Sequence, residues 1–191
     1  FKRSVLEALR QPMEDGQVTI SRVNASVVYP SKFMLAAAMN PCPCGYLGDS
    51  RCHCTASEIA AYRKRISGPL LDRIDIYDVT YNDLNSKEKA ESSAEIKKRV
   101  SAARDIQLTR YKNEGVYFNS QLSSAQTDKF CILDKEASAL AETAFDSLSL
   151  SARSYHKILK VARTIADLEN SEIIKAHHIA EAMQYRMLKN D

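Results

Sequence analysis

Four cysteines within thirteen residues constrain the fold of this chain more than any other sequence feature. They form two close pairs, Cys42-x-Cys44 and Cys52-x-Cys54, and two of the seven residues between the pairs are glycines. Four thiolates can close a tetrahedral zinc site, and glycines allow a short loop to fold back on itself. The C-x-C spacing is less common than C-x-x-C, so free thiols and disulfides stay open as alternatives. We predict one structural Zn²⁺ ion at these four cysteines.

The rest of the composition indicates a compartment in which these thiols stay reduced. No apolar run approaches the roughly 20 residues needed to cross a bilayer, and no signal peptide opens the chain. We therefore expect a cytoplasmic protein without a membrane partner, where clustered cysteines more often bind metal than pair. His53 lies between two cysteines and is interpreted as pointing away from the ion. The fifth cysteine, Cys131, is interpreted as a small buried side chain.

Two short apolar runs flank the cysteines and predict buried strands of a parallel sheet. They are Phe33 to Ala38 and Ile74 to Val79. Asn40 follows the first run, and ligands of open α/β sheets bind beyond the carboxyl ends of strands. Asn40 is therefore a candidate site residue, although asparagine also simply ends strands.

Two arginines are candidate anion contacts. Arg73 stands at the entrance of the second predicted strand, where it could contact a ligand or form a structural ion pair with Asp72 or Asp75. Arg153 falls in the first turn of a predicted helix, where the helix dipole disfavours a cation. An anion such as a phosphate would offset that unfavourable placement. Surface solvation is the alternative for both arginines.

Local signals predict the elements of the first part of the chain. A helix that contains Val5 should end near Gln11, because the residue before a proline is pushed out of the helical region. Alternation from Val18 to Tyr29 predicts a β-hairpin. Thr55 or Ser57 should cap a helix, and a further turn of helix should follow Ser67.

The second part of the chain reads as a small helical bundle. Ser92-x-x-Glu95 is a capping box, and amphipathic stripes of helical period predict four helices. The stripes consist of Ile96, Val100, Ala103 and Gln107; Ala137, Leu140, Ala144 and Phe145; Ile158, Ala162 and Ile165; and Ile179, Met183 and Met187. Asp134 and Ser151 are the expected caps of the second and third helices, and residues 113–128 are expected to form a loop. The predicted architecture is α/β followed by all-α, with parts spanning residues 1–85 and 86–191.

Length and charge set wide limits on function. The 191 residues can hold one sizeable domain or two small ones, and the net charge of +3 permits nucleic acid as a partner without demanding it. No G-x-x-x-x-G-K-[ST] motif is present, so the chain carries no phosphate-binding loop of its own. The sequence runs directly into a helical pattern at Phe1, which leads us to expect a fragment of a longer protein.

Four long strings give the sequence a specific resemblance. FKRSVLEALRQPMEDGQVTISR, AAMNPCPCGYLGD, RISGPLLDRIDI and LSARSYHKILKVARTIADLE closely resemble the magnesium-chelatase-like ATPases of the ComM/YifB family. The likeness covers nearly the whole chain. It implies the C-terminal portion of an AAA+ P-loop ATPase core with a hairpin insert, followed by a helical lid, with the P-loop and the acidic Walker B strand upstream of Phe1.

The resemblance also implies roles for the candidate residues. Asn40 in AAMNP matches sensor 1, Arg73 in LLDRID matches the arginine finger that reaches the nucleotide of a neighbouring subunit, and Arg153 in SARSYH matches sensor 2 of the lid. ATP and Mg²⁺ are then cofactors of the full-length protein only, and the fragment alone should be inactive.

The implied function is that of a hexameric motor acting on DNA, including branch migration during natural transformation. Two alternatives stay open: a chelatase-type subunit that drives metal insertion into a tetrapyrrole, and a zinc-stabilised interaction module without motor activity. The cysteine loop favours the motor over the chelatase, because that loop belongs to the ComM-like branch of the resemblance.

Overall fold

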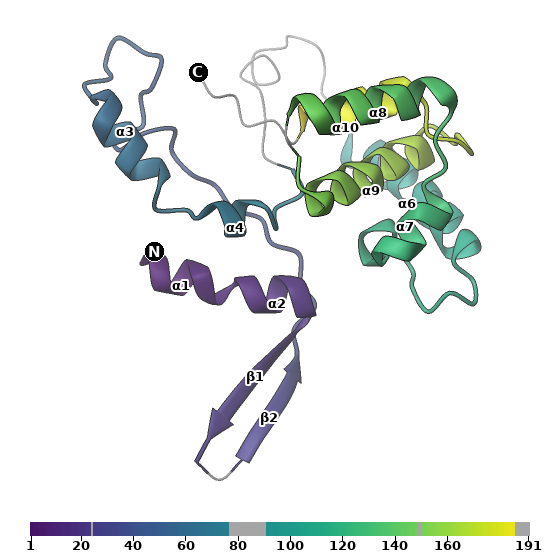
Figure 1. Cartoon of the computed structure of the whole chain (residues 1–191), viewed down its shortest axis with the longest axis horizontal. Helices are drawn as coiled ribbons and strands as arrows, with labels where there is room; N and C mark the ends of the chain where they lie inside the picture. The colour runs from purple at the N-terminus through teal and green to yellow at the C-terminus, as the bar shows by residue number, and fades with distance from the viewer. Residues whose placement is uncertain (24, 77–90, 149, 186–191) are drawn as a thin grey trace. The chain divides into compact units, whose positions relative to one another are not determined.

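The computed structural model describes residues 1–23, 25–76, 91–148 and 150–185 (Figure 1). The chain divides into two compact units, Phe1–Ile74 and Asp75–Asp191. The predicted boundary between residues 85 and 86 lies outside the described residues. Within the described helices, none combines the length and apolar character needed to cross a bilayer.

The first unit begins with two short helices that lead into a hairpin. The helices are α1 (Arg3–Ala8) and α2 (Arg10–Asp15). The prediction that helix ends before Pro12 is wrong. Pro12 occupies the first turn of α2, where its missing N–H would have had no helical partner. Helix α2 ends at Gly16, whose φ of +64° gives the left-handed cap.

The predicted hairpin is confirmed. Strands β1 (Gln17–Arg22) and β2 (Ala25–Pro30) pair antiparallel, with Gln17 opposite Pro30 and Arg22 opposite Ala25. Figure 1 shows the hairpin extending from the end of α2. Its side chains are largely exposed, and Val23 at the tip is fully so.

The predicted strand at residues 33–38 is not formed. This stretch is exposed and irregular, and among the described residues the sheet consists of β1 and β2 alone. An apolar run becomes a strand only when a neighbouring strand pairs with its N–H and C=O groups. No such neighbour lies beside it within the described part of the unit. Ile74–Ile76 are likewise not in a strand, and residues 77–79 lie outside the described residues.

Two capped helices complete the first unit. Thr55 caps α3 (Ala56–Arg63) and exchanges hydrogen bonds with Glu58 in a capping box. Ser67 caps α4 (Gly68–Leu71) by accepting a hydrogen bond from the Leu70 N–H. Of the two candidate caps Thr55 and Ser57, the structure has Thr55, and the predicted turn of helix after Ser67 is confirmed. The cysteine loop lies on the N-terminal side of α3.

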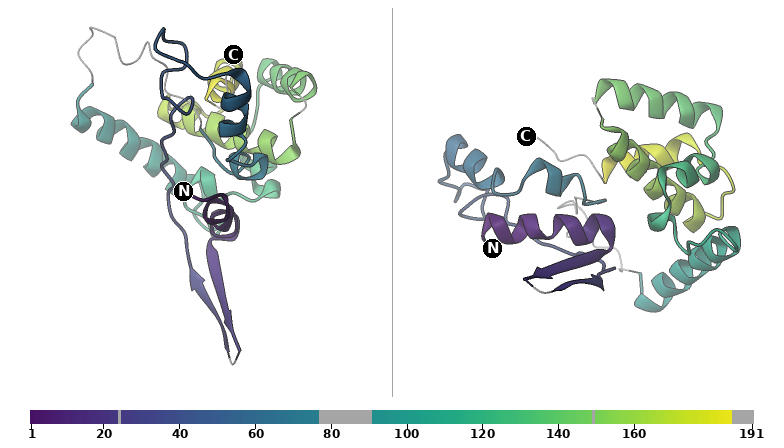
Figure 2. Two further views of the ribbon diagram at one scale, coloured as in Figure 1. Left: turned by 90° about the vertical axis from the view of Figure 1, so that its left-hand side faces the viewer. Right: turned by 60° about the horizontal axis from the view of Figure 1, so that its bottom comes forward.

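The described part of the second unit consists of helices, and α9 is at their centre. Its described elements are α6 (Ser93–Arg110), η1 (Asn119–Gln121), α7 (Ser124–Phe130), α8 (Lys135–Ser147), α9 (Ala152–Leu168) and α10 (Ala176–Gln184). Helix α9 packs against α6, α7, η1 and α10, and α10 also packs against α8 (Figure 2). The predicted caps Ser92, Asp134 and Ser151 are confirmed.

Some side chains of the predicted amphipathic stripes are buried in the helical bundle, and others are exposed. Ala137, Ala144, Ile158, Ala162, Ile165 and Ile179 belong to the described core. Ile96 and Val100 are exposed, as is every residue of α6 before Ala103, which is the first buried residue of this helix. Met187 lies outside the described residues. The predicted loop at 113–128 in fact contains η1 and the start of α7, whose N-cap Ser123 forms a capping box with Gln126.

Candidate functional site

The four clustered cysteines converge on one point. Their sulfur atoms all lie within 4.8 Å of one another, and no disulfide joins them. The Cys42 sulfur is 3.3 Å from that of Cys44 and 3.9 Å from that of Cys52, and Cys44 and Cys52 are 3.6 Å apart. A tetrahedral Zn–S₄ site with bonds of about 2.3 Å has sulfur–sulfur edges of about 3.8 Å. The cluster therefore fits a tetrahedral zinc ion.

Three successive tight turns bring the two cysteine pairs together. The N–H of Gly45 donates to the carbonyl of Cys42 at 3.1 Å, that of Asp49 to Tyr46 at 2.9 Å, and that of Cys52 to Asp49 at 2.9 Å. Gly45 and Gly48 have φ values of +85° and +87°, which are strained for any residue with a Cβ. This confirms that the two glycines allow the loop to fold back.

The electrostatics of the cluster favour a bound cation. The backbone N–H of Tyr46 and the neighbouring Cys42 thiol lower the pKa of Cys44 to about 6. The N–H of Cys44 favours the Cys54 thiolate, but the neighbouring Cys44 sulfur and burial outweigh it and raise the pKa of Cys54 to about 12. Without a cation, Cys54 resists ionising beside the Cys44 thiolate, because like charges at this distance repel. A divalent ion would remove that repulsion.

A second cluster, at the junction of α9 and α10, is less suited to a metal. Glu169 Oε2 lies 2.9 Å from His177 Nε2 and 3.0 Å from His178 Nε2. However, His178 Nδ1 accepts a hydrogen bond from the Lys175 N–H at 2.9 Å. That bond leaves the proton of neutral His178 on Nε2, the atom that would have to coordinate the ion. We interpret this cluster as a structural link between the two helices.

The two predicted nucleotide-contact residues of the first unit lie in different surroundings. Asn40 is exposed, with its side chain beside Gly45 of the cysteine loop. Arg73 is half-buried and paired, as the alternative of a structural ion pair predicts, but with a different partner. Its side chain is 12% exposed, it pairs with Glu14, and its Nη1 donates to the Pro69 carbonyl at 2.6 Å. Its Nε is buried without a hydrogen-bond partner among the described residues.

The third predicted contact residue, Arg153, belongs to the second unit. It is exposed in the first turn of α9, after the N-cap Ser151. Its position on the chain therefore agrees with the prediction of a cation at a helix N-terminus. Asn40 and Arg73 belong to the first unit, so the three residues are described separately and their grouping stays a prediction.

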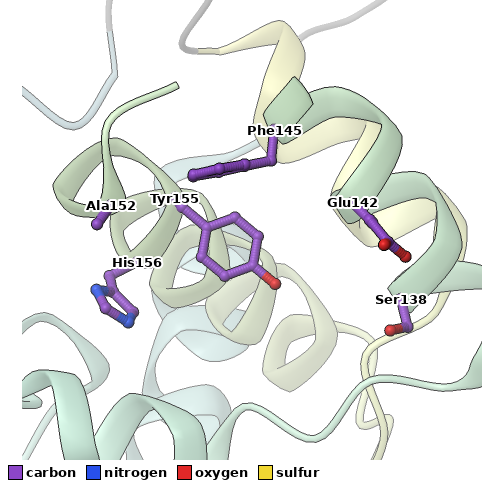
Figure 3. Close-up of a pocket in the computed structure, with 6 residues that line it drawn as sticks. All are labelled: Ser138, Glu142, Phe145, Ala152, Tyr155 and His156. Atoms are coloured by element: carbon purple, nitrogen blue, oxygen red, sulfur yellow. The ribbon is translucent and has the colours of Figure 1, made fainter. Parts of the chain in front are cut away.

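A hollow of about 490 Å³ lies between α8 and α9 (Figure 3). It is lined by Ser138, Glu142, Phe145, Ala152, Tyr155 and His156. Phe145 and Tyr155 meet edge to face with ring centres 5.6 Å apart. None of the predicted site residues lines this hollow, and its polar groups do not form a nucleophile–base pair. We assign it no catalytic role.

The sequence analysis did not predict two contacts, one made by Arg73 and one made within the cysteine loop. Glu14 is the partner of Arg73, although 59 positions separate them, and no local signal identifies such a pair. Asp49 binds the guanidinium of Arg51 through Oδ1 and Oδ2, each at 3.0 Å, and Arg51 covers the Tyr46 ring at 4.2 Å. The Asp-x-Arg spacing inside the cysteine loop could have indicated the second contact.

Comparison with known protein families shows to which family the chain belongs. Residues 1–89 match the profile described as magnesium chelatase, subunit ChlI, and residues 90–186 match the profile of the C-terminal part of the same subunit. The chain belongs to the magnesium chelatase ChlI family. The two matches meet between residues 89 and 90.

Individual relatives agree with the family assignment. The chain is 39% identical over 193 aligned residues to the competence protein ComM of Haemophilus influenzae and 40% identical to the uncharacterized protein YifB of Escherichia coli K12. It is 39% identical to YifB of Salmonella typhimurium. Each alignment covers 98% of this chain and 37% of the relative. The resemblance to the ComM/YifB group is confirmed, and the chain spans a little over a third of the length of these relatives.

Proposed function

We propose that this chain is part of an ATP-dependent AAA+ motor that remodels DNA as a hexameric ring in the cytoplasm. The observation that carries this proposal is the 39% identity to a competence protein along 98% of the chain. In this proposal, residues 1–85 complete the α/β core and residues 86–191 form the lid. The exposed, irregular stretch at 33–38 supports a place for residues 1–85 in a larger core, because its backbone N–H and C=O groups would pair with core strands elsewhere in the full-length protein, which would also bury its apolar side chains.

The three polar residues take the roles that phosphoryl transfer requires. Asn40 would orient the attacking water, Arg153 would contact the phosphates of the same nucleotide, and Arg73 would reach the nucleotide of the adjacent subunit. Catalysis of this kind consists mainly of positioning and charge neutralisation, and an arginine supplied in trans raises the rate by about 10³–10⁵. ATP and Mg²⁺ would bind only in the full-length protein.

Glu14 adds a condition to the role of Arg73. Because the guanidinium is paired with this carboxylate, it has to exchange Glu14 for a phosphate when it enters the neighbouring site. A charge-for-charge exchange is feasible, since both partners are anions that accept hydrogen bonds from the same donors. The pair would hold Arg73 in an ordered conformation until the ring assembles.

The cysteine cluster would hold one structural Zn²⁺ ion. Its four sulfurs lie close to the vertices that zinc requires, and the ion would fix the two ends of an otherwise irregular loop. The loop includes Gly45, and the Asn40 side chain lies so close to it that a Cβ built on Gly45 would stand 3.6 Å from Asn40 Nδ2. Zinc binding would therefore also restrict the position of Asn40.

The description of the matched family, magnesium chelatase, favours the chelatase alternative. One experiment decides between the DNA motor and the chelatase. The ATPase rate of the full-length protein is measured with forked DNA, and separately with a tetrapyrrole, Mg²⁺ and a metal-binding partner subunit. Stimulation by DNA together with unwinding of the fork supports the motor. ATP-dependent metal insertion without any response to DNA would replace it with the chelatase function.

A further inference from the structure

The tip of the cysteine loop displays an ordered aromatic side chain. The tip comprises residues 46–51, and Tyr46 at its start is 44% exposed. Tyr46 stands two residues after Cys44 in the cysteine loop, and its carbonyl accepts a hydrogen bond from the Asp49 N–H at 2.9 Å, so the backbone that carries the ring is held by a tight turn. Apart from Gly48 itself and its two chain neighbours, no heavy atom of the described residues lies within 4 Å of the point where a Cβ on Gly48 would stand, so the space beside that glycine is open.

One contact orients the ring. The Arg51 guanidinium lies 4.2 Å from the ring centre of Tyr46 and is itself fixed by two hydrogen bonds to Asp49, each 3.0 Å long. The Arg51 N–H donates to the same carboxylate at 2.9 Å. A ring that is partly exposed and held by a planar cation is pre-organised, so it loses little conformational freedom when a flat ligand stacks on it.

The charge of the first unit identifies the kind of ligand. Its sequence contains ten lysines and arginines against six aspartates and glutamates, whereas the second unit contains seventeen against eighteen. The net positive charge of the chain therefore comes from the unit that carries the loop. Aromatic rings on a basic surface are how proteins bind single-stranded nucleic acid, since every base offers a π face and every nucleotide a phosphate.

We propose that the loop tip is a contact for single-stranded DNA, in which the Tyr46 ring stacks on a base. This inference rests on the proposed function and specifies which part of the protein touches the DNA. The Asp49–Arg51 pair orients the ring, a zinc ion at the four cysteines would anchor the loop, and the net positive charge of the first unit would attract the phosphates. A protein ligand is the competing possibility, and the experiment distinguishes it.

The test measures binding of a fluorescein-labelled single-stranded oligonucleotide of mixed sequence to the full-length protein by fluorescence anisotropy at several salt concentrations. We expect Tyr46→Ala to weaken binding by about 5- to 150-fold. The slope of log affinity against log salt should be unchanged, because no phosphate contact is removed. Tyr46→Phe should bind like wild type, since it retains the ring.

A matched control uses Tyr117, which is 61% exposed in the second unit. Tyr117→Ala should bind DNA like wild type. Zinc content and thermal unfolding of Tyr46→Ala should match wild type, because the substitution changes none of the four cysteines and retains the backbone turn from Tyr46 to Asp49. Wild-type affinity of Tyr46→Ala for DNA would overturn the inference, in favour of a protein ligand, and leave the DNA motor intact. A wild-type protein that does not bind DNA would overturn the proposed function together with this inference.

Discussion

Arg163 and Asp167 form an ion pair inside the second unit that is almost fully shielded from solvent. Arg163 Nε donates to Asp167 Oδ1 at 3.1 Å, one helical turn along α9, with side-chain exposures of 1% and 0%. Asp167 also accepts hydrogen bonds from Arg110 of α6 and from Asn119 of η1. Arg163 in turn donates to the carbonyls of Ser171 and Glu172. This network joins the parts of the bundle that precede and follow α9.

We expect Asp167→Asn to destabilise the second unit strongly. The substitution leaves the Arg163 guanidinium buried without its counter-charge, which costs about 3–5 kcal/mol in comparable buried pairs. Urea unfolding followed by circular dichroism measures the loss. The control is Glu91→Gln in the exposed Arg99–Glu91 pair, which should change stability by less than about 1 kcal/mol. Equal effects of the two substitutions would show that the buried network does not stabilise the bundle.

Zinc analysis tests the cysteine cluster. Protein purified without chelator should contain about one zinc ion per chain, and Cys42→Ser should lose it and lower the unfolding temperature. Cys131→Ala is the matched control, because Cys131 is also buried but lies outside the cluster. The Cys131→Ala variant should retain the zinc ion. A metal-free wild-type protein, or zinc retained in Cys42→Ser at wild-type affinity, contradicts the assignment.

The turns of the cysteine loop can be tested separately from its ligands. Gly45→Ala places a Cβ at a φ of +85°, which costs about 1–2 kcal/mol in the left-handed region. The variant should therefore release zinc to a chelator several-fold faster than wild type. Gly68→Ala should release zinc at the wild-type rate, since Gly68 lies in α4 without a positive φ and, beyond its own helix and chain neighbours, no described atom would lie within 4 Å of the added Cβ. Equal release rates for the two variants would mean that the glycine turn does not stabilise the metal centre.

The link between α9 and α10 should weaken in acid. His177 and His178 lower the pKa of Glu169 from its ordinary value of 4.5. A carboxyl group whose pKa is lower in the folded state stabilises the protein above its unfolded pKa, and this stabilisation is lost as the pH falls through the folded value. Glu169→Gln should therefore reduce the acid sensitivity of the unfolding midpoint between pH 6 and pH 3. The change should be small, because Glu169 is half exposed. An unchanged pH profile argues against the link.

Subunit mixing tests Arg73. In the full-length protein, Arg73→Ala should reduce the ATPase rate by about 10³-fold or more. Mixed with an inactive Walker B variant it should recover part of the activity, because a ring of both subunits contains some intact sites. Lys64→Ala, at the exposed end of α3, is the control and should hydrolyse ATP like wild type. Turnover of Arg73→Ala within about threefold of wild type rules out a finger role.

The sequence by itself determined the local structure and the cysteine centre. Caps such as Thr55, Ser92 and Ser151, the β1–β2 hairpin and the two glycine turns depend on hydrogen bonds and φ angles within a few residues, so their signals are contained in short windows. The C-x-C pairs likewise require a short loop to close. The family resemblance rests on such local strings and was confirmed for the same reason.

Only the tertiary structure decided which distant groups meet. Residues 33–38 have the composition of a strand but are not in one, because a strand also requires a partner that the sequence of the segment does not specify. Arg73 pairs with Glu14, 59 positions away, a partner that the sequence did not suggest. Asp167 collects donors from α6, η1 and α9. These choices depend on how elements far apart in the chain pack, since a charged group becomes paired and buried only where packing brings its partner and excludes water.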